Sequence, residues 1–312
     1  MPALMPAIAE DWCLGIAPLR FSTHWPRVTN SGLHWKFNNQ SGDNVKLISN
    51  SAIVTGAAQG IGRGIAERLM RDGANVLLFG RTGAKVEEAA RDLNRISEGR
   101  TRAVPFEGDV SRAEDVARGI EVATRELGLP GILVNNAGTA TLAPLLDLPD
   151  EDFDQVMATN LKGPFLFMKA FGRALVQAQQ PGVVVNISSL NQIAVTDGLA
   201  HYCASKAGLA NLSKVAASEL GRHGIRVNVV APGVIRTPLA ESVGLIEVMG
   251  QEFLARTPLG KACGMPADVA GVVSFLCGED AAWITGETIS VDGGNHIRGL
   301  HSYWDVMSRA AK

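Results

Sequence analysis

Short apolar runs alternate with longer segments whose apolar residues recur every three or four positions, and this pattern fills most of the chain after residue 45. The short runs indicate buried β-strands, and the longer segments indicate amphipathic helices. Strands are predicted at residues 52–55, 76–79, 103–106, 132–134, 183–187, 227–230 and 288–291. Helices are predicted at residues 62–72, 84–96, 113–127, 152–177 and 202–222.

Strands that alternate with helices predict a parallel sheet, because each crossover helix returns the chain to the same end of the sheet. We therefore expect an α/β fold, a Rossmann-type doubly wound parallel sheet of seven strands with helices on both faces. The pattern predicts a single domain over residues 46–298. Right-handed crossovers place its ligand crevice at the carboxyl ends of the strands, where the strand order reverses.

The two ends of the chain fall outside this pattern. Residues 1–45 show no periodicity of either kind, yet they hold three of the five tryptophans. Disordered segments are usually poor in aromatic residues, so we expect this extension to pack onto something. We favour an appendage on its own domain, or residues upstream of the true start, over an arm that binds a partner. The tail at residues 299–312 begins with an aromatic cluster, and we hypothesise that residues 297–304 dock at a subunit interface near a substrate pocket.

Composition removes several classes of function. The formal net charge of −2 provides no broad basic field, so we expect no nucleic-acid partner. No apolar run approaches the roughly 20 residues that cross a bilayer, and the first residues do not resemble a secretory signal. The four cysteines lack metal-ligand spacing, which predicts reduced thiols, no metal and a cytoplasmic location.

A glycine-rich turn follows the first predicted strand and opens the first predicted helix. Gly56, Gly60 and Gly62, with Gln59 and Ile61 between them, form the sequence Thr-Gly-Ala-Ala-Gln-Gly-Ile-Gly. Such a turn lets free N–H groups at the helix start face a pyrophosphate, and side chains there would hold the backbone away. The plain alternative is a glycine turn without a ligand. Its place between strand and helix favours dinucleotide binding.

The end of the second predicted strand bears on the choice of cofactor. An acidic residue there would accept hydrogen bonds from the adenosine ribose and select NAD. This chain has Gly80 followed by Arg81, whose guanidinium suits a 2′-phosphate. Arg63 could add charge. We therefore expect NADP(H) to be preferred, with NAD(H) as the alternative cofactor. The simpler interpretation is that both arginines are solvated surface residues.

Several motifs in one order resemble the short-chain dehydrogenase/reductase family, in its compact single-domain branch. The resemblance covers about four-fifths of the chain, roughly residues 47–296. Beside the glycine turn it includes Asp109-Val110, Asn135-Asn136-Ala137-Gly138, Asn160, Ser189, Tyr202 with Lys206, Pro232-Gly233 and Asp292-Gly293-Gly294. Gln59 departs from the pattern, because many NADP-dependent members carry a basic residue there.

The resemblance assigns further residues to the cofactor. It implies that Asp109 and Val110 contact the adenine, and that the segment ending in Asn136, Ala137 and Gly138 closes the cofactor groove. It also places Pro232, Gly233 and Val234 beside the nicotinamide, with Thr237 near the carboxamide. Tyr202 and Lys206 complete the predicted cofactor contacts, and in this family the lysine bonds to the nicotinamide ribose.

The expected chemistry is hydride transfer, which requires a proton donor at the substrate oxygen. Tyr202 can serve, but a free phenol has a pKa near 10. Lys206 lies one helical turn further on, and we expect its ammonium to lower that pKa. Ser189 precedes Tyr202 by thirteen residues and is expected to hold the substrate oxygen, while alternation turns Ser188 away. By resemblance Asn160 is the fourth catalytic residue and supports a proton-relay water. His201 is expected to be structural.

Function is predicted as an NADP(H)-dependent carbonyl reductase or alcohol dehydrogenase. Residues 239–253 indicate a mobile helical flap, but the mixed lining fits an acyl thioester, a cyclic ketone, a steroid or a polyol equally well. One alternative is an epimerase or dehydratase of the extended branch, which has a shorter glycine spacing and a larger C-terminal domain. Another is a nucleotide-sensing protein that has lost its chemistry.

The resemblance also bears on assembly. The predicted helices at residues 152–177 and 202–222 correspond to those that form the main interface in tetramers of the family. They carry Phe165, Phe167, Leu209 and Leu212, more apolar positions than one helical face needs. A homotetramer is expected, or failing that a dimer.

Overall fold

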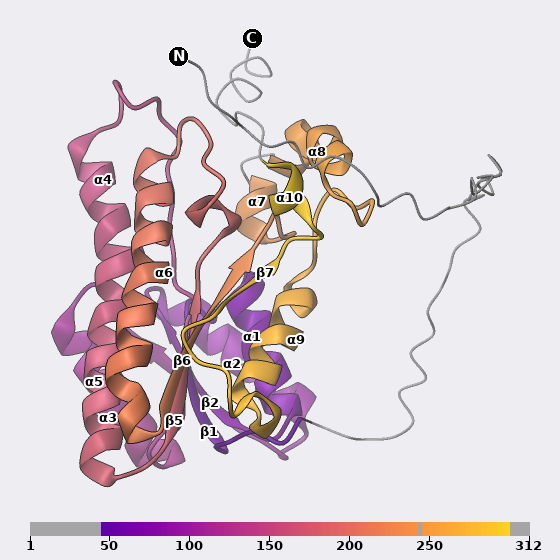
Figure 1. The fold of residues 1–312 in the computed structure, drawn as a ribbon. Coiled ribbons are helices and arrows are strands. Elements are labelled where there is room, and N and C mark those ends of the chain that lie inside the picture. Colours follow the sequence, from indigo (N-terminus) through magenta and orange to yellow (C-terminus); the bar gives the residue numbers. More distant parts are fainter. Residues whose placement is uncertain (1–44, 243–244, 300–312) are drawn as a thin grey trace, which may run out of the picture. The chain divides into compact units, whose positions relative to one another are not determined.

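The computed structural model describes residues 45–242 and 245–299, and within them the predicted strands form one parallel sheet. The strand order is β3-β2-β1-β4-β5-β6-β7 (Figure 1). The order reverses between β1 and β4, which makes their carboxyl ends the expected ligand crevice. The strands are β1 (Ser51–Thr55), β2 (Asn75–Gly80), β3 (Ala103–Glu107), β4 (Ile132–Asn135), β5 (Gly182–Ile187), β6 (Ile225–Pro232) and β7 (Thr288–Val291).

Helices cover both faces of the sheet. On one face lie α1 (Gly60–Arg71), α2 (Gly83–Ser97) and α9 (Pro266–Cys277), and on the other lie α3 (Ala113–Leu127), α5 (Gly163–Ala178) and α6 (Ala200–Leu220) (Figure 1). The remaining helical elements are α4 (Asp150–Met157), η1 (Ala158–Lys162), η2 (Leu190–Gln192), η3 (Gly221–His223), α7 (Pro238–Ser242), α8 (Leu245–Arg256), η4 (Glu279–Ala281) and α10 (Asn295–Arg298).

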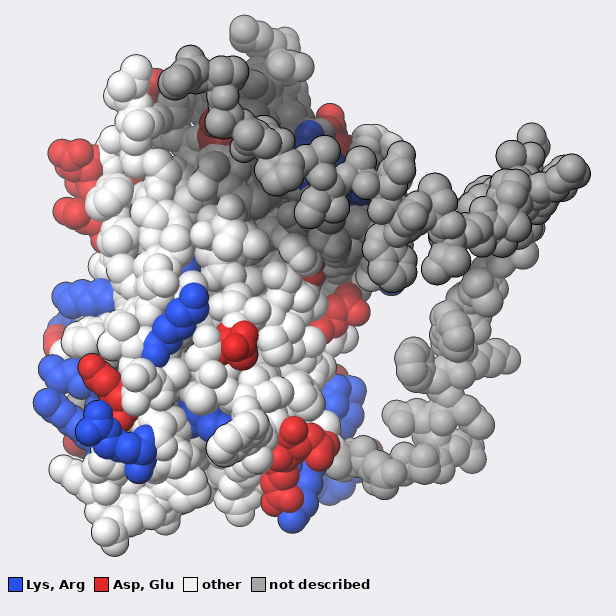
Figure 2. All heavy atoms as spheres, viewed as in Figure 1, with Lys and Arg blue, Asp and Glu red and all other residues white. Residues whose placement is uncertain are grey.

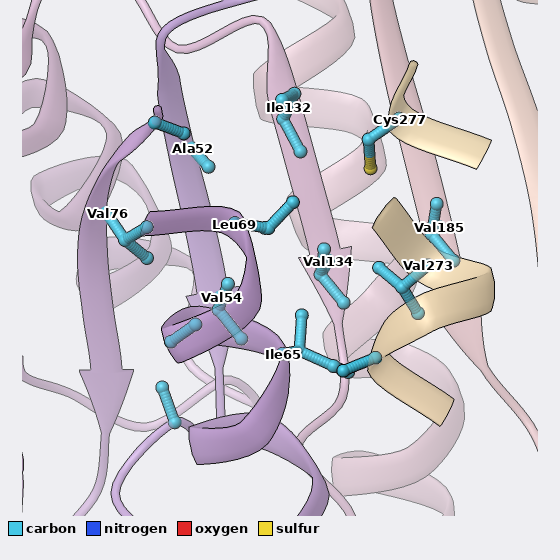
Figure 3. Close-up of a cluster of buried hydrophobic side chains, with 14 of the residues drawn as sticks. Ala52, Val54, Ile65, Leu69, Val76, Ile132, Val134, Val185, Val273 and Cys277 are labelled. Atoms are coloured by element: carbon cyan, nitrogen blue, oxygen red, sulfur yellow. The ribbon is translucent and has the colours of Figure 1, made fainter. Parts of the chain in front are cut away.

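Alternate residues of the central strands supply the two cores. Val54 and Val134 face α1 and α9, where they meet Ile65, Leu69 and Val273 (Figure 3). The intervening strand residues face α3 and α5 in the second core. A strand that is covered on both faces needs apolar side chains at every position, which is why the sequence shows continuous apolar runs.

One helix was absent from the sequence prediction. Helix α9 packs along α1 and buries Val269, Val273 and Leu276 completely. Its sequence is apolar on nearly every side, so it lacks the polar stripe that distinguishes an amphipathic helix. Asp72 at the end of α1 accepts hydrogen bonds from Arg68 at 2.7 Å and from the Ser274 hydroxyl of α9, so the two helices are joined by polar contacts as well.

Two predicted helices are interrupted. The segment at residues 152–177 comprises α4, a π-turn (η1) and α5, and the segment at residues 239–253 comprises α7 and α8. The predicted extension at residues 1–45, apart from Val45, and the tail from residue 300 onward lie outside the described residues. Among the helices of the described part, none is both long enough and apolar enough to span a bilayer.

Candidate active site

The glycine turn packs closely against neighbouring segments because it lacks side chains. Gly56 and Gly60 have φ angles of +63° and +58°, in the left-handed region. A Cβ at Gly56 would lie 2.9 Å from the Ala137 Cα, and one at Gly62 would collide with the Gly56 carbonyl. Gln59 precedes α1 in an extended conformation without capping the helix through its side chain. The first N–H groups of α1 are therefore available to an anion, which fits a pyrophosphate.

The end of β4 is fastened to the glycine turn. The Thr55 hydroxyl accepts hydrogen bonds from the backbone N–H groups of Asn136 at 2.9 Å and Ala137 at 3.0 Å. The Asn136 side-chain amide donates to the Thr55 carbonyl at 2.9 Å. These bonds join the two strand ends at the point where the strand order reverses. Thr55 was not among the predicted site residues, although it opens the glycine motif.

The end of β6 approaches the same turn from the other side. A Cβ on Gly60 would lie 3.3 Å from the Thr237 Cγ2, so these two backbone segments are close together. Gly233 donates to the Val291 carbonyl at 3.0 Å, and a Cβ on it would lie 2.7 Å from the Asp292 Cβ. Pro232 ends β6 beside Val291 of β7. The predicted nicotinamide residues thus line one edge of the crevice.

The predicted adenosine end differs in part from expectation. Asp109 accepts hydrogen bonds from Ser111 through both the backbone N–H at 2.8 Å and the hydroxyl at 2.7 Å, and Val110 beside it is buried. Arg81 is exposed. Arg63 instead forms an ion pair with Asp92 at 2.9 Å, so its charge is already partnered.

Ser189 and Tyr202 come together at the end of β5 and the start of α6. The Ser189 hydroxyl caps η2 by accepting from the Asn191 N–H at 3.1 Å, and it donates to the Asn191 side-chain oxygen at 3.0 Å. It also shares a hydrogen bond with the Tyr202 phenol. An apolar cluster that includes Leu199 and Phe253 packs against Tyr202. Asn191 is a further residue of the site, signalled in the sequence only by its place after Ser189.

Burial changes the acid–base properties of Tyr202 and Lys206. Burial raises the pKa of the Tyr202 phenol above its ordinary value, and the hydrogen bond with Ser189 opposes that rise. Lys206 is 4% exposed, and burial lowers its pKa to about 8. Its ammonium donates to the Ile187 carbonyl at 2.9 Å and lies 5.6 Å from the centroid of the Tyr202 ring. The net pKa of Tyr202 is raised and not lowered, because desolvation of the phenol outweighs its hydrogen bond with Ser189; that the Lys206 ammonium lowers this pKa stays a prediction.

Asn160 lies in the π-turn between α4 and α5 and is fully buried. Its side-chain oxygen accepts from the Thr139 N–H at 2.9 Å, and its amide donates to the Thr139 carbonyl at 2.9 Å and the Ser205 hydroxyl at 3.2 Å. π-Turns are rare and often mark functional sites. A Cβ on Gly138 would lie 3.4 Å from the Asn160 oxygen and 3.6 Å from the Lys206 ammonium. Gly138, which is predicted to close the cofactor groove, therefore lies next to both residues.

Two neighbouring residues do not point to chemistry. The Ser188 hydroxyl donates to the Lys206 carbonyl at 3.0 Å, inside the protein. His201 is fully buried, its Nε2 lies 2.9 Å from the Thr141 hydroxyl, and burial lowers its pKa. Both contacts belong to the scaffold that positions Tyr202.

Comparison with known proteins places this geometry in a family. A family model described as enoyl-(acyl carrier protein) reductase matches residues 56–296. The chain is 40% identical over 255 residues to the (3R)-3-hydroxyacyl-CoA dehydrogenase of Rattus norvegicus. The matched region covers 80% of this chain and 97% of that protein. It is 36% identical over 249 residues to the 3-oxoacyl-acyl-carrier-protein reductase of Chlamydia trachomatis, covering 80% of this chain and 98% of that protein.

Solved structures agree in fold over the same region. A short-chain type dehydrogenase/reductase from Mycobacterium marinum superposes with a TM-score of 0.75 at 32% identity, covering 81% of this chain and 98% of that one. The Brucella melitensis 3-oxoacyl-acyl-carrier-protein reductase gives a TM-score of 0.73 at 32% identity, covering 80% of this chain and 92% of that one. The chain therefore belongs to the short-chain dehydrogenase/reductase family and is a nicotinamide-dependent oxidoreductase that acts on carbonyl or alcohol substrates.

Proposed function

We propose that this enzyme interconverts 3-oxoacyl and 3-hydroxyacyl thioesters with NADP(H), using Tyr202 as the general acid and base. Two relatives from different organisms are named for substrates of this one class, a hydroxyacyl-CoA and an oxoacyl carrier protein. The observation that carries the substrate class is the apolar cluster around Tyr202. Met249 and Phe253 of α8 close over the tyrosine with Leu199, an environment that suits an acyl chain better than a polyol.

The proposed chemistry follows from what surrounds the phenol. A bound nicotinamide would supply hydride to the substrate carbon. Tyr202 would donate its proton to the substrate oxygen, and its raised pKa keeps that proton in place at neutral pH. Ser189 already shares a hydrogen bond with the phenol, so its hydroxyl is placed to hold the same substrate oxygen. Lys206 holds positive charge beside the ring and stabilises the phenolate that remains.

The role of Asn160 in this proposal is positioning. Its side-chain groups bond to Thr139 and Ser205, so we infer that it fixes the backbone rather than contacting substrate. A relay water would then depend on backbone groups near the π-turn. A nucleotide-sensing protein without catalytic activity would not require these hydrogen bonds around Asn160. Their presence therefore favours an enzyme.

The preference for NADP(H) is proposed on charge. Arg81 follows the end of β2, is exposed, and makes no ion pair with any described residue. Gly80 supplies no carboxylate for a ribose hydroxyl. A Cβ at Gly80 would lie 2.7 Å from Val86 Cγ2, so an acidic residue there would require the Val86 side chain to shift. These features favour a 2′-phosphate over a free hydroxyl.

A substrate and cofactor screen tests the proposal. Oxidation and reduction would be followed by nicotinamide absorbance, with acetoacetyl-CoA, a cyclic ketone, a steroid ketone and a polyol, each with both cofactors. The expected result is the highest kcat/KM with acetoacetyl-CoA and NADPH. A higher kcat/KM for the polyol or the cyclic ketone would contradict the substrate class, and a higher value with NADH would contradict the cofactor preference.

A further inference from the structure

A carboxylate lies beside the predicted ribose site, although the end of β2 lacks one. In the pairing of β2 with β3, Gly80 stands opposite Glu107, the last residue of β3. The two strand ends are also joined by a hydrogen bond from the Gly108 N–H to the Gly80 carbonyl at 3.0 Å. Glu107 is exposed to solvent. The neighbouring strand thus supplies the acidic group that position 80 does not.

The direction of the Glu107 side chain is settled by Gly83, the first residue of α2. A Cβ added at Gly83 would overlap Glu107 Oε2, so the carboxylate rests directly against the start of this helix. Phe106, one residue earlier in β3, packs on the opposite face of the sheet against Phe79. Alternation along the strand therefore places Glu107 on the α2 side. Arg81 stands two residues before Gly83, at the same corner of the molecule.

The two charges at this corner have opposite effects on the cofactor. A phosphate monoester carries about 1.5 to 2 negative charges near neutral pH, which Arg81 attracts and Glu107 repels. A ribose hydroxyl can instead donate a hydrogen bond to a carboxylate. Glu107 therefore disfavours the 2′-phosphate and is compatible with the free hydroxyl.

We propose that Glu107 is a specificity-determining residue of the cofactor site and weakens the discrimination that Arg81 creates in favour of NADP(H). This inference rests on the proposed role of the Gly80–Arg81 corner in ribose recognition. It predicts that this chain binds NAD(H) as well, although the end of β2 carries no acidic residue. The net preference is the difference between two opposed charges.

The test measures binding to the full-length protein without turnover. Adenosine 2′,5′-bisphosphate and 5′-AMP differ only in the 2′-phosphate, and isothermal titration calorimetry gives the affinity for each. Glu107→Gln keeps the size of the side chain and removes its charge. The affinity for the bisphosphate relative to 5′-AMP is expected to rise about 1.5- to fivefold, an effect in the range of exposed charge pairs. High salt should reduce this gain, because both charges are exposed.

Matched controls separate this inference from the proposed preference for NADP(H). Glu88→Gln removes an equally exposed carboxylate further along α2 and is expected to leave the ratio unchanged. Arg81→Ala tests the preference itself and should lower the ratio. If wild type favours 5′-AMP but Glu107→Gln still raises the ratio, the NADP(H) preference fails and the role of Glu107 stands. A ratio that Glu107→Gln leaves unchanged, or changes no more than Glu88→Gln does, overturns the role of Glu107.

Discussion

At the residue scale, the chemistry depends on one partly buried phenol and its hydrogen bond to Ser189. Replacing Tyr202 with Phe removes the hydroxyl and keeps the ring in its apolar cluster. Turnover is expected to fall by about a hundredfold or more, the usual contribution of a general acid. Cofactor affinity and the unfolding temperature should stay close to wild type. Steady-state kinetics with calorimetric binding checks both, and turnover within a few-fold of wild type would rule out the assignment.

Lys206 provides a second residue-scale prediction, on stability rather than rate. Burial lowers its pKa from 10.5 to about 8 in the folded protein. Between these values the unfolded chain binds more protons, so the folded state becomes more stable as pH rises through this window. Below pH 8 the penalty of burying the ammonium is present in full.

The measurement is the free energy of unfolding of wild type and Lys206→Met, by denaturant titration at several pH values. The difference between them should move in favour of wild type by about 3 kcal/mol between pH 7 and pH 10.5. Groups that titrate identically in both proteins cancel in this difference. A pH-independent difference would show that the Lys206 pKa is not lowered in the folded state.

At the element scale, α8 contributes to the apolar cluster that packs on Tyr202. Its Met249 and Phe253 are almost completely buried in the cluster that packs on the tyrosine. The carboxyl end of α8 is anchored to α10, because Arg256 donates to the Arg298 carbonyl at 2.9 Å and Arg298 donates to the Ala255 carbonyl at 3.0 Å. In Figure 1 the two helices lie side by side.

Truncating the inner face of α8 should therefore change an ionisation. Phe253→Ala admits water beside the phenol, which removes part of the desolvation that raises the pKa of Tyr202. The pKa of Tyr202 is expected to fall, together with a stability loss of about 3 to 5 kcal/mol for an emptied aromatic site. Phenolate absorbance during an alkaline titration follows the pKa. Phe275→Ala, at a partly exposed phenylalanine of α9, is the control and should leave it unchanged.

At the scale of the whole molecule, the proposed association depends on the outer surface of α4, α5 and α6. A groove there runs past Gly208 and is lined mainly by apolar side chains: Met157, Ala158, Leu161, Phe165 and Leu212, with Asp154 and Lys162. Phe165 remains 43% exposed beside this groove. Figure 2 shows charged side chains in separate groups with broad uncharged areas between them.

We expect a tetramer, or failing that a dimer, that buries this groove. Phe165→Glu introduces a charge where two helical faces would meet, so it should reduce the mass measured by light scattering at micromolar concentration. Ile96→Glu places the same charge at an equally exposed apolar residue on α2 and should leave the mass unchanged. A monomeric wild type would contradict the proposal. An equal loss of mass in both variants would move the interface away from the groove.

The sequence by itself determined the sheet, the crossovers and the location of the crevice, because these follow from local patterns. Apolar runs mark strands that are covered on both faces, and glycine at 56, 60 and 62 marks a turn that no side chain can occupy. The order of motifs identified the family. Helix α9 escaped notice because its sequence is apolar on nearly every side and therefore lacks the polar stripe by which an amphipathic helix is detected.

Only the tertiary structure decided the direction of the pKa shifts at the site and the partners of its charged side chains. Sequence spacing alone placed Lys206 near Tyr202. The burial of both side chains depends on α6, α8 and the sheet together. This burial raises the pKa of the Tyr202 phenol, whereas the sequence predicted a lowered pKa. The sequence offers both Arg63 and Arg81 as positive charges for a phosphate, yet of the two only Arg63 forms an ion pair with Asp92. Glu107 lies opposite Gly80 because β3 pairs with β2. Electrostatic effects depend on distance and solvent exposure, which are fixed by contacts between segments remote in the chain.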